Sequence, residues 1–266
     1  MKLSVLLSAM HLEDENYIDT LNITTDAVVI NQCDRESVKD IDHVCTDGTT
    51  SKIRYIETRE RGLSKSRNMA LNECDSDICI LCDNDVEYES GYDKTILDAY
   101  KLHPEADVIV FFVKRPERSS AIFDKDKRMG YLSVLKIFSP EISIRRSSIK
   151  DIRFDENFGA GAKYCMGEEN LFLYECLKKH RKIIYVPKMI AKVRDEESTW
   201  FSGYTREFFI SRGANYAAMS RLFSCVLIMQ FALRKKSLYK ETLSMSQAID
   251  AMFEGRRKYL KEKGNS

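Results

Sequence analysis

Strands and helices alternate along the first half of the chain, and this alternation constrains the fold more than any other feature. Short apolar segments, several of them rich in β-branched residues, are each followed by a segment with polar or helical spacing. This pattern predicts a largely parallel sheet covered by helices on both faces. The predicted strands cover residues 3–8, 27–31, 52–57, 77–82 and 106–114, and the predicted helices cover 14–22, 64–73 and 90–102.

The second half of the chain is less regular. A charged connection over 115–130 leads to a segment predicted to be strand-rich, and a loop with several glycines precedes a predicted helix. A short strand that Pro187 ends comes next, and the pattern is helical from about residue 205 onward. The corresponding ranges are 131–149 for the strand-rich segment, 155–167 for the loop, 168–180 for the helix and 182–186 for the short strand.

Charge and hydropathy exclude several classes of protein. The 266 residues include 42 basic and 41 acidic ones, a formal net charge of +1, whereas a protein that binds duplex nucleic acid is normally more basic. No apolar run reaches the roughly 18–20 residues that span a bilayer. The apolar run at the start is short and is followed at once by acids, so we expect a first strand and not a signal peptide. The eight cysteines are therefore expected to be reduced.

Cysteine and histidine do not predict a metal site. Cys79 and Cys82 form a C-x-x-C motif, but they lie in a predicted strand, where residues three apart point to opposite faces. No second cysteine pair lies at the spacing of a zinc ribbon, and the four histidines are scattered.

Two short motifs carry candidate chemistry. Asp83-Asn84-Asp85 follows the strand predicted over 77–82, at the edge of a parallel sheet where ligands bind. Carboxylates there suit Mg²⁺ or Mn²⁺, although Asp and Asn are also common in turns after strands. The stretch 59–68 combines a turn at Gly62 and a candidate N-cap at Ser64 with cations. These features suit a phosphate group, and the alternative is a solvated basic helix face; the cations are Arg61, Lys65 and Arg67.

Three blocks of sequence together resemble a known family. They are ERGLSKSRNMAL, CILCDNDVEY and FDENFGAGAKYCMGEENLFLYECLKKHRKIIYVP, and they occur in this order. They resemble the family 2 nucleotide-sugar glycosyltransferases, and in particular bacterial enzymes of capsular and exopolysaccharide biosynthesis. The resemblance covers most of residues 1–190. It implies the GT-A fold, a Rossmann-like α/β fold with a mixed, mostly parallel sheet. We expect a catalytic domain over 1–204, with a nucleotide-sugar half at 1–114 and an acceptor half at 115–204, and a helical extension over 205–266.

The resemblance also implies site residues. In the family, the D-x-D motif binds a divalent metal and the donor diphosphate, and the second member of an acidic pair is the catalytic base. The metal ligands would be Asp83 and Asp85, for Mn²⁺ or Mg²⁺, and the acidic pair would be Glu168 and Glu169, with Glu169 as the base. The donor-binding residues would be Ser8, Gln32, Arg67, Asn68, Asp83 and Asn84.

The chain departs from the family pattern at three places. The second strand leads into Asn31-Gln32-Cys33-Asp34, where the family has one or two aspartates that bind the nucleotide. The predicted base is a glutamate where aspartate is usual. The stretch 191–195 contains no histidine, although many relatives place a metal-reaching histidine there.

The implied activity is inverting, metal-dependent transfer of a hexosyl group from a nucleotide-diphosphate sugar, with UDP favoured. The acceptor would be a glycan or a lipid-linked glycan in polysaccharide biosynthesis. Two alternatives stay open. A nucleotidyltransferase also uses a parallel sheet and metal-binding acids, but residues 8–17 lack the glycines expected after its first strand. A non-catalytic partner subunit could keep the fold without turnover.

The C-terminal segment predicts a location. Residues 212–266 carry 11 basic and 4 acidic side chains, a net charge of +7, so residues 1–211 carry −6. Within this segment, residues 222–233 form an apolar run flanked by Arg221 and by Arg234-Lys235-Lys236. As a helix this run is about 18 Å long, too short to span a membrane. It would either lie in the interface of an anionic membrane or pack on the catalytic domain. We expect a cytoplasmic protein with peripheral contact at the inner face of the membrane.

Overall fold

The structure is a computed structural model that describes residues 1–194 and 203–264. Among these residues the chain forms two compact units. The first, here the sheet unit, comprises residues 1–61, 65–153 and 173–194. The second, here the helical unit, comprises residues 62–64, 154–172 and 203–264. The division into a catalytic domain and an extension at residue 204 stays a prediction.

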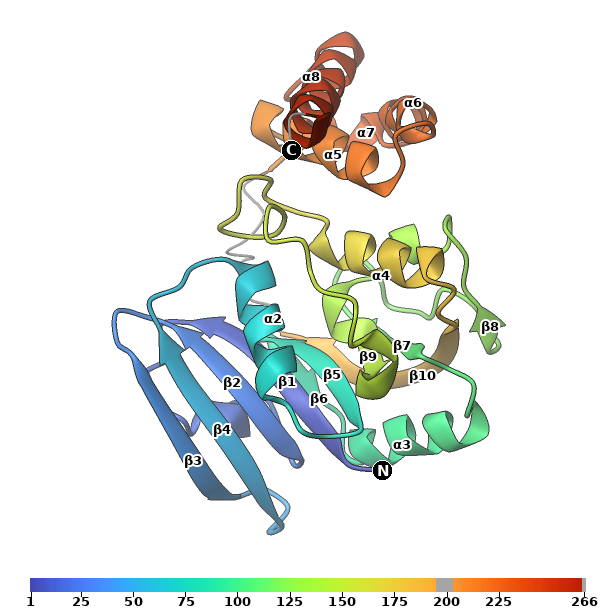
Figure 1. The fold of residues 1–266 in the computed structure, drawn as a ribbon. Coiled ribbons are helices and arrows are strands. Elements are labelled where there is room, and N and C mark those ends of the chain that lie inside the picture. Colours follow the sequence, from blue (N-terminus) through green and yellow to red (C-terminus); the bar gives the residue numbers. More distant parts are fainter. Residues whose placement is uncertain (195–202, 265–266) are drawn as a thin grey trace. The chain divides into compact units, whose positions relative to one another are not determined.

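One mixed sheet forms the centre of the sheet unit (Figure 1). Its strand order is β3-β4-β2-β1-β5-β9-β7-β10-β6, and β8 pairs with β10. Among the strands of the described residues, β4, β2, β1, β5, β7 and β10 point in one direction, because β9 runs antiparallel to both β5 and β7. The predicted mixed, mostly parallel sheet is thus confirmed. The strands are β1 (Leu3–Met10), β2 (Asp26–Gln32), β3 (Ser37–Val44), β4 (Thr50–Thr58), β5 (Ile78–Asp83), β6 (Val86–Tyr88), β7 (Val108–Lys114), β8 (Lys127–Arg128), β9 (Ile142–Arg145) and β10 (Ile183–Val193).

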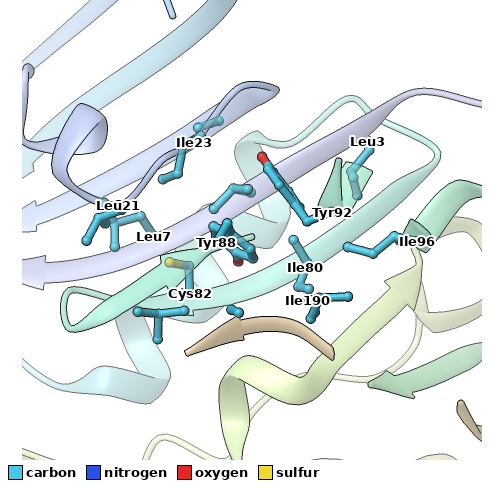
Figure 2. Close-up of a cluster of buried hydrophobic side chains, with 14 of the residues drawn as sticks. Leu3, Leu7, Leu21, Ile23, Ile80, Cys82, Tyr88, Tyr92, Ile96 and Ile190 are labelled. Carbon is cyan, nitrogen blue, oxygen red and sulfur yellow. The ribbon is translucent and has the colours of Figure 1, made fainter. Parts of the chain in front are cut away.

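Both faces of β1 are buried, which explains why this strand is a continuous apolar run. Leu3 and Leu7 face the core that Figure 2 shows, together with Ile80 of β5 and Ile96 of a helix. In the same core the rings of Tyr88 and Tyr92 stack with their centroids 4.2 Å apart. The opposite face of β1 contacts α2.

Four α-helices begin before residue 170 among the described residues. They are α1 (Tyr17–Thr20), α2 (Leu63–Glu73), α3 (Tyr92–Leu102) and α4 (Glu168–Lys178).

The cysteines of the C-x-x-C motif lie on opposite faces of β5, as predicted. Cys82 belongs to the core in Figure 2, whereas the thiol of Cys79 lies 3.1 Å from that of Cys74 at the end of α2. All eight cysteines are free thiols in the structure. The cysteines that meet are therefore Cys74 and Cys79, which lie on different elements.

The prediction that Pro187 ends a short strand is wrong. Strand β10 continues through this residue and pairs with β7 on both sides of it. The register of this pairing shifts between Tyr185 and Met189. Proline has no N–H for the ladder and is tolerated in a strand at such an irregularity. The continued strand brings Arg194 to the same edge of the sheet as the end of β5.

The prediction of a strand-rich segment over 131–149 is also largely wrong. Within this segment β9 is the only strand, and three short 3₁₀ helices take up much of the remainder. Pro140 opens one of these turns, and the buried carboxylate of Glu141 accepts a hydrogen bond from the backbone N–H of Phe138, 2.9 Å away. The same carboxylate pairs with Arg118. These local bonds compete with strand pairing. The three helices are Val134–Lys136, Ser139–Glu141 and Arg146–Ile149.

Three strands of the described residues, β3, β6 and β8, were not predicted, and one helix is shorter than predicted. Strand β3 pairs antiparallel with β4 at the edge of the sheet, and most of its side chains are at least partly exposed. An exposed edge strand does not need the apolar pattern of a buried one. Strand β6 has only three residues, and α1 covers four residues of the predicted helix 14–22.

The helical unit contains four further helices, which agrees with the helical pattern predicted beyond residue 205. Helix α5 packs closely on α8 at two glycines. A Cβ atom on Gly213 would lie 1.8 Å from the carbonyl oxygen of Met252, and one on Gly255 would lie 1.9 Å from that of Ile210. Among the described residues, none of the helices combines the length and apolar character that crossing a bilayer requires. The helices are α5 (Arg206–Met219), α6 (Ser224–Arg234), α7 (Lys236–Tyr239) and α8 (Met245–Gly264).

Candidate active site

The six strands that point in one direction all end at one edge of the sheet, here called the carboxyl edge. Ligands of open α/β sheets bind outside this edge, because loops and helix N-termini converge there. The residues that end these strands are Met10, Gln32, Thr58, Asp83, Lys114 and Val193. Several predicted donor-binding residues belong to this set or follow it directly.

A buried ion pair occupies the end of β5. The guanidinium of Arg67, from α2, donates a hydrogen bond to a carboxylate oxygen of Asp83 over 2.9 Å. The Arg67 side chain is 1% exposed and that of Asp83 is 15% exposed. A buried cation of this kind needs an anionic partner, and this pair fixes the direction of the Asp83 carboxylate.

Ser8 lies beside this pair. It is opposite Asp83 in the register of β1 with β5, and its hydroxyl accepts a hydrogen bond from that of Ser66 over 2.8 Å. The structure therefore places Ser8, Arg67 and Asp83 together, and their role in donor binding stays a prediction. Asn68, the next residue of α2, is also buried.

Asn31 and Gln32, the polar residues at the end of β2, make different contacts. The Asn31 side chain accepts a hydrogen bond from Leu12 N–H and donates to Leu12 C=O and to the hydroxyl of Tyr55. These bonds hold the loop after β1 against β2. Burial raises the pKa of Tyr55 to about 12, so its hydroxyl stays protonated. Gln32 ends the strand with a buried side chain, and its backbone carbonyl accepts from His11 N–H.

The D-N-D turn is held by two residues that the sequence analysis did not identify. The carbonyl oxygen of Asn84 accepts hydrogen bonds from the Tyr17 hydroxyl and from a guanidinium nitrogen of Arg194, each over 2.8 Å. Arg194 also donates to the Tyr17 hydroxyl over 2.8 Å, and its backbone N–H donates to the carbonyl of Asp85. Arg194 thus lies in the stretch where relatives carry a histidine. Asp195, the last residue of that stretch, lies outside the described residues.

Each cation predicted at the start of α2 has an acidic partner within the sheet unit. Arg61 pairs with Asp34 over 2.7 Å, Lys65 pairs with Glu60 over 3.4 Å, and Arg67 pairs with Asp83. Arg61 also donates to the backbone carbonyls of Cys33 and Thr58, so it ties the loops after β2 and β4 together.

The helix start itself differs from the prediction. Helix α2 begins at Leu63, so Ser64 is inside the helix and is not its N-cap. The Ser64 hydroxyl instead donates to the carbonyl of Phe158 over 2.6 Å. Gly62 has a positive φ of 122°, which agrees with the predicted turn.

The predicted acidic pair opens helix α4 in the helical unit. Glu168 is the first residue of the helix and is buried, whereas Glu169 is partly exposed. The Glu168 carboxyl group lies against Gly159, where an added Cβ would be 3.2 Å from its oxygen. The helix start is held by Asn215 of α5, which donates to the carbonyl of Gly167 over 2.9 Å.

The glycine-containing loop is tied to the last helix of the helical unit. Lys163 pairs with Glu262 of α8 over 2.6 Å. The ring of Tyr164 stacks on Phe158, and both rings contact Tyr259 of α8. Burial raises the pKa of Tyr164 to about 12.

The donor atoms of the D-N-D turn are compatible with the expected divalent metal. Asp83 and Asp85 offer carboxylate oxygens, the ligand type that Mg²⁺ and Mn²⁺ prefer. Among the described residues, no three or more His, Cys, Asp or Glu side chains form a metal-binding group. This donor set fits a metal that is held by one or two carboxylates and completed by substrate phosphates and water.

Several solved structures share the fold. The crystal structure of S. aureus TarS 1–349 matches with a TM-score of 0.62 at 16% identity, over 96% of this chain and 80% of that one. Its complex with UDP-GlcNAc matches with a TM-score of 0.64 at 17% identity, over 94% and 79%. The mannosyltransferase PcManGT from Pyrobaculum calidifontis, in complex with GDP-Man and Mn²⁺, matches with a TM-score of 0.52 at 14% identity, over 96% and 73%. The sheet and helices thus have the predicted GT-A fold.

Sequence comparison matches part of the chain to a family. No curated protein is significantly similar to the chain in sequence. Residues 23–149 match glycosyl transferase family 2, and this range contains the D-N-D turn, Arg67 and four of the six strands that share one direction. The chain thus has the GT-A fold and, over these residues, is similar to the family 2 glycosyltransferases.

Proposed function

We propose that the protein is an inverting glycosyltransferase that moves a hexosyl group from a nucleotide-diphosphate sugar to a glycan or lipid-linked acceptor in polysaccharide biosynthesis. The observation that carries the proposal is the buried Arg67–Asp83 pair beside Ser8 at the carboxyl edge. The family match supports sugar transfer, and the similar proteins were solved with UDP-GlcNAc and with GDP-Man. We favour a UDP-sugar as the donor.

The donor diphosphate would bind at the D-N-D turn. Asp83 and Asp85 would hold Mn²⁺ or Mg²⁺, which would neutralise the charge that develops on the leaving nucleoside diphosphate. Arg67 orients the Asp83 carboxylate. Tyr17 and Arg194 hold the backbone of the turn in place. The nucleoside would extend along the ends of β1 and β2, towards Ser8 and Gln32, with Asn68 and Asn84 as further donor-binding residues.

Glu169 is proposed as the catalytic base. Its carboxylate takes the proton of the acceptor hydroxyl while the hydroxyl oxygen attacks the anomeric carbon. The bond from the anomeric carbon to the phosphate oxygen breaks, and the nucleoside diphosphate leaves with the electron pair. Attack from the opposite face inverts the configuration. The first turn of α4 favours the ionised carboxylate that a base requires, and Glu168, buried against Gly159, would position this turn.

A thermal-shift panel tests the donor. UDP- and GDP-sugars are compared with and without Mn²⁺, because the similar structures contain both kinds of nucleotide. A donor held at 100 times its dissociation constant stabilises the fold by about 2.7 kcal/mol. We expect stabilisation by a UDP-sugar that depends on Mn²⁺. Stabilisation by nucleoside triphosphates, and release of pyrophosphate from a nucleoside triphosphate when a sugar phosphate is added, would instead indicate a nucleotidyltransferase.

The variant Glu169→Gln tests the base. It removes the charge while keeping the size, so turnover should fall by about 10²–10⁴-fold with little change in donor binding. Donor hydrolysis and sugar transfer are measured under the conditions that the panel identifies. The matched control is Glu175→Gln on the same helix, whose carboxylate is 40% exposed and should not affect turnover. Near-normal transfer by the Glu169 variant would refute the assignment, and a wild-type protein that binds donor without any turnover would indicate a partner subunit.

A further inference from the structure

Helix α6 of the helical unit has two apolar faces, and only one of them is packed against other helices. Its buried face includes Leu227, Ile228 and Ala232, and the unit's helices α5 and α8 contact this helix. Arg256 of α8 donates to the Ser224 hydroxyl, and the Tyr239 hydroxyl donates to the carbonyl of Ala232 over 2.5 Å. These contacts fix the rotation of α6 about its axis.

The other face of α6 is an exposed apolar stripe. Leu222 is 84% exposed, Phe223 67%, Val226 63%, Met229 41% and Leu233 61%. Val226, Met229 and Leu233 are spaced three to four residues apart, so they lie on one side of α6, and Leu222 and Phe223 lie in the turn that leads into it. A contiguous exposed apolar stripe on a folded unit marks an interaction site more often than a chance arrangement.

Basic residues stand at both ends of this stripe. Arg221 precedes it, and Arg234, Lys235 and Lys236 follow it, all of them exposed. Lys240 follows on the next turn, and residues 221–240 contain no acid. The stripe therefore presents an apolar surface about 16 Å long, the length of an 11-residue helix, between two positive ends.

We propose that this face of α6 binds the surface of an anionic membrane, with the helix lying in the plane of the interface. The exposed apolar side chains would enter the boundary between headgroups and acyl chains, and the basic ends would contact anionic headgroups. A second copy of the chain fits this face less well. If two copies of α6 paired antiparallel about a two-fold axis, Arg221 of each copy would meet the three cations at the far end of the other. If they paired in parallel, the same cations of the two copies would meet each other. Neither arrangement offers an acid from residues 221–240 to neutralise these charges.

Co-sedimentation with vesicles tests the proposal on the full chain. Binding to vesicles of phosphatidylcholine with about 30% phosphatidylglycerol is compared with binding to vesicles of pure phosphatidylcholine, at low and at high salt. We expect binding to the anionic vesicles that weakens with salt, because the Debye length falls from about 30 Å at 0.01 M to about 3 Å at 1 M. Equal binding to neutral vesicles, or no binding to anionic vesicles at low salt, would overturn the proposal.

Two surface variants separate the apolar and the charged contributions. Phe223→Ser with Leu233→Ser should weaken binding by at least about tenfold, since both side chains would be buried in the interface. Arg234→Gln with Lys235→Gln and Lys236→Gln should weaken it by about 100-fold, because each cation near an anionic surface contributes about a factor of five. The matched controls are Val38→Ser with Val44→Ser, exposed on β3, and Lys94→Gln with Lys150→Gln and Lys188→Gln, and neither should change binding.

The same variants distinguish this proposal from self-association and from the proposed function. The substituted side chains are exposed, so thermal unfolding and sugar transfer to a soluble acceptor should stay near the wild-type values. Sedimentation velocity over a range of concentrations reports any dimer. A dimer that the Phe223 and Leu233 substitutions abolish, in a protein that ignores anionic vesicles, would assign the face to a second copy and refute the membrane proposal.

Discussion

The two edges of the central sheet differ in how exposed their charged side chains are. At the carboxyl edge, Arg67 and Asp83 form a buried pair. At the opposite edge, where β1, β2 and β4 begin, an open cavity of about 500 Å³ is lined by charged residues. Most of those charges are exposed, and Arg54, which pairs with both Asp40 and Glu73, is 37% exposed. This cavity is thus not at the edge where the D-N-D turn lies.

We therefore base the proposed site on the buried, convergent polar groups of the carboxyl edge and not on open volume. Exposed ion pairs are screened by water and add little to stability, whereas a buried pair loses much more when one partner is removed. A buried ion pair is costly to desolvate, and we propose that it is present here because a charged ligand binds at the strand ends. The predictions below compare the two edges, from the largest expected effect to the smallest.

The largest effect is expected for the arginines of the two edges. Arg67→Met leaves the Asp83 carboxylate without its cation, and should lower the free energy of unfolding by about 3–5 kcal/mol. Arg54→Met, at the other edge, should lower it by less than about 1 kcal/mol. Urea denaturation measures both. Arg67→Lys keeps the charge and should recover part of the loss. Equal losses for Arg67→Met and Arg54→Met would abolish the distinction between the edges.

The next effect concerns ligand binding. Asp85→Asn keeps the fold, because the residue is in a turn, but it weakens the proposed metal ligation. The Mn²⁺-dependent stabilisation by the donor, about 2.7 kcal/mol at 100 times the dissociation constant, should therefore be lost. Asp40→Asn at the other edge, where the side chain is 74% exposed, should retain it. If both variants bind the donor like the wild type in thermal-shift measurements, the metal assignment is wrong.

A smaller effect is expected for the residue that holds the D-N-D turn. Tyr17→Phe removes the hydroxyl that donates to Asn84 and accepts from Arg194, so we expect a loss of about 0.5–1.5 kcal/mol in the free energy of unfolding. Donor affinity should also fall, because the turn would be less well ordered. Tyr131→Phe is the control, since Tyr131 is exposed and keeps its ring contact with Tyr174 as phenylalanine. If Tyr17→Phe lowers the free energy of unfolding but does not change donor affinity, Tyr17 has only a structural role.

The smallest effect is a pH dependence at the end of β4. Arg35, and after it Ser37, hydrogen-bond the buried carboxylate of Glu57 and hold its pKa below the ordinary value of 4.5. Because the pKa is lower in the folded state, this contribution to stability is fully present above about pH 4.5 and is lost as the pH falls through the folded-state value. Glu57→Gln should flatten the acid limb of stability below about pH 4.5. An unchanged acid limb in urea denaturation at several pH values would contradict the assignment.

Part of the candidate site could be predicted from the sequence because its signals are local. The alternation of strands and helices predicted the parallel strands, and the acids directly after the strand at 77–82 had to lie at its carboxyl end, where Asp83 and Asp85 are found. The acidic pair followed a glycine with a positive φ, and α4 begins at Glu168 as predicted. The period of apolar residues and the residues that start or end a helix or strand depend only on neighbouring positions in the sequence, so they can be recognised before the fold is known.

The partners of these residues could not be predicted in the same way. Arg194 and Tyr17 are 177 positions apart, and they meet only because β10 continues past Pro187 to the edge where β5 ends. The sequence predicted phosphate-binding cations at the start of α2, but the structure pairs each of them with an acid from another part of the sheet unit or the adjoining loop.

The sequence by itself indicated the resemblance to a family, the succession of the main parallel strands along the chain, and the position of the D-N-D turn at a strand end. The tertiary structure alone decided which polar groups face one another, that edge strand β3 exists, and which face of α6 is exposed. The physical reason is that periodicity limits a side chain to one face of its element, whereas burial depends on what packs against that face. Residues 222–233 are apolar on both sides, and only the packing of α5 and α8 determined which side is left to interact with something else.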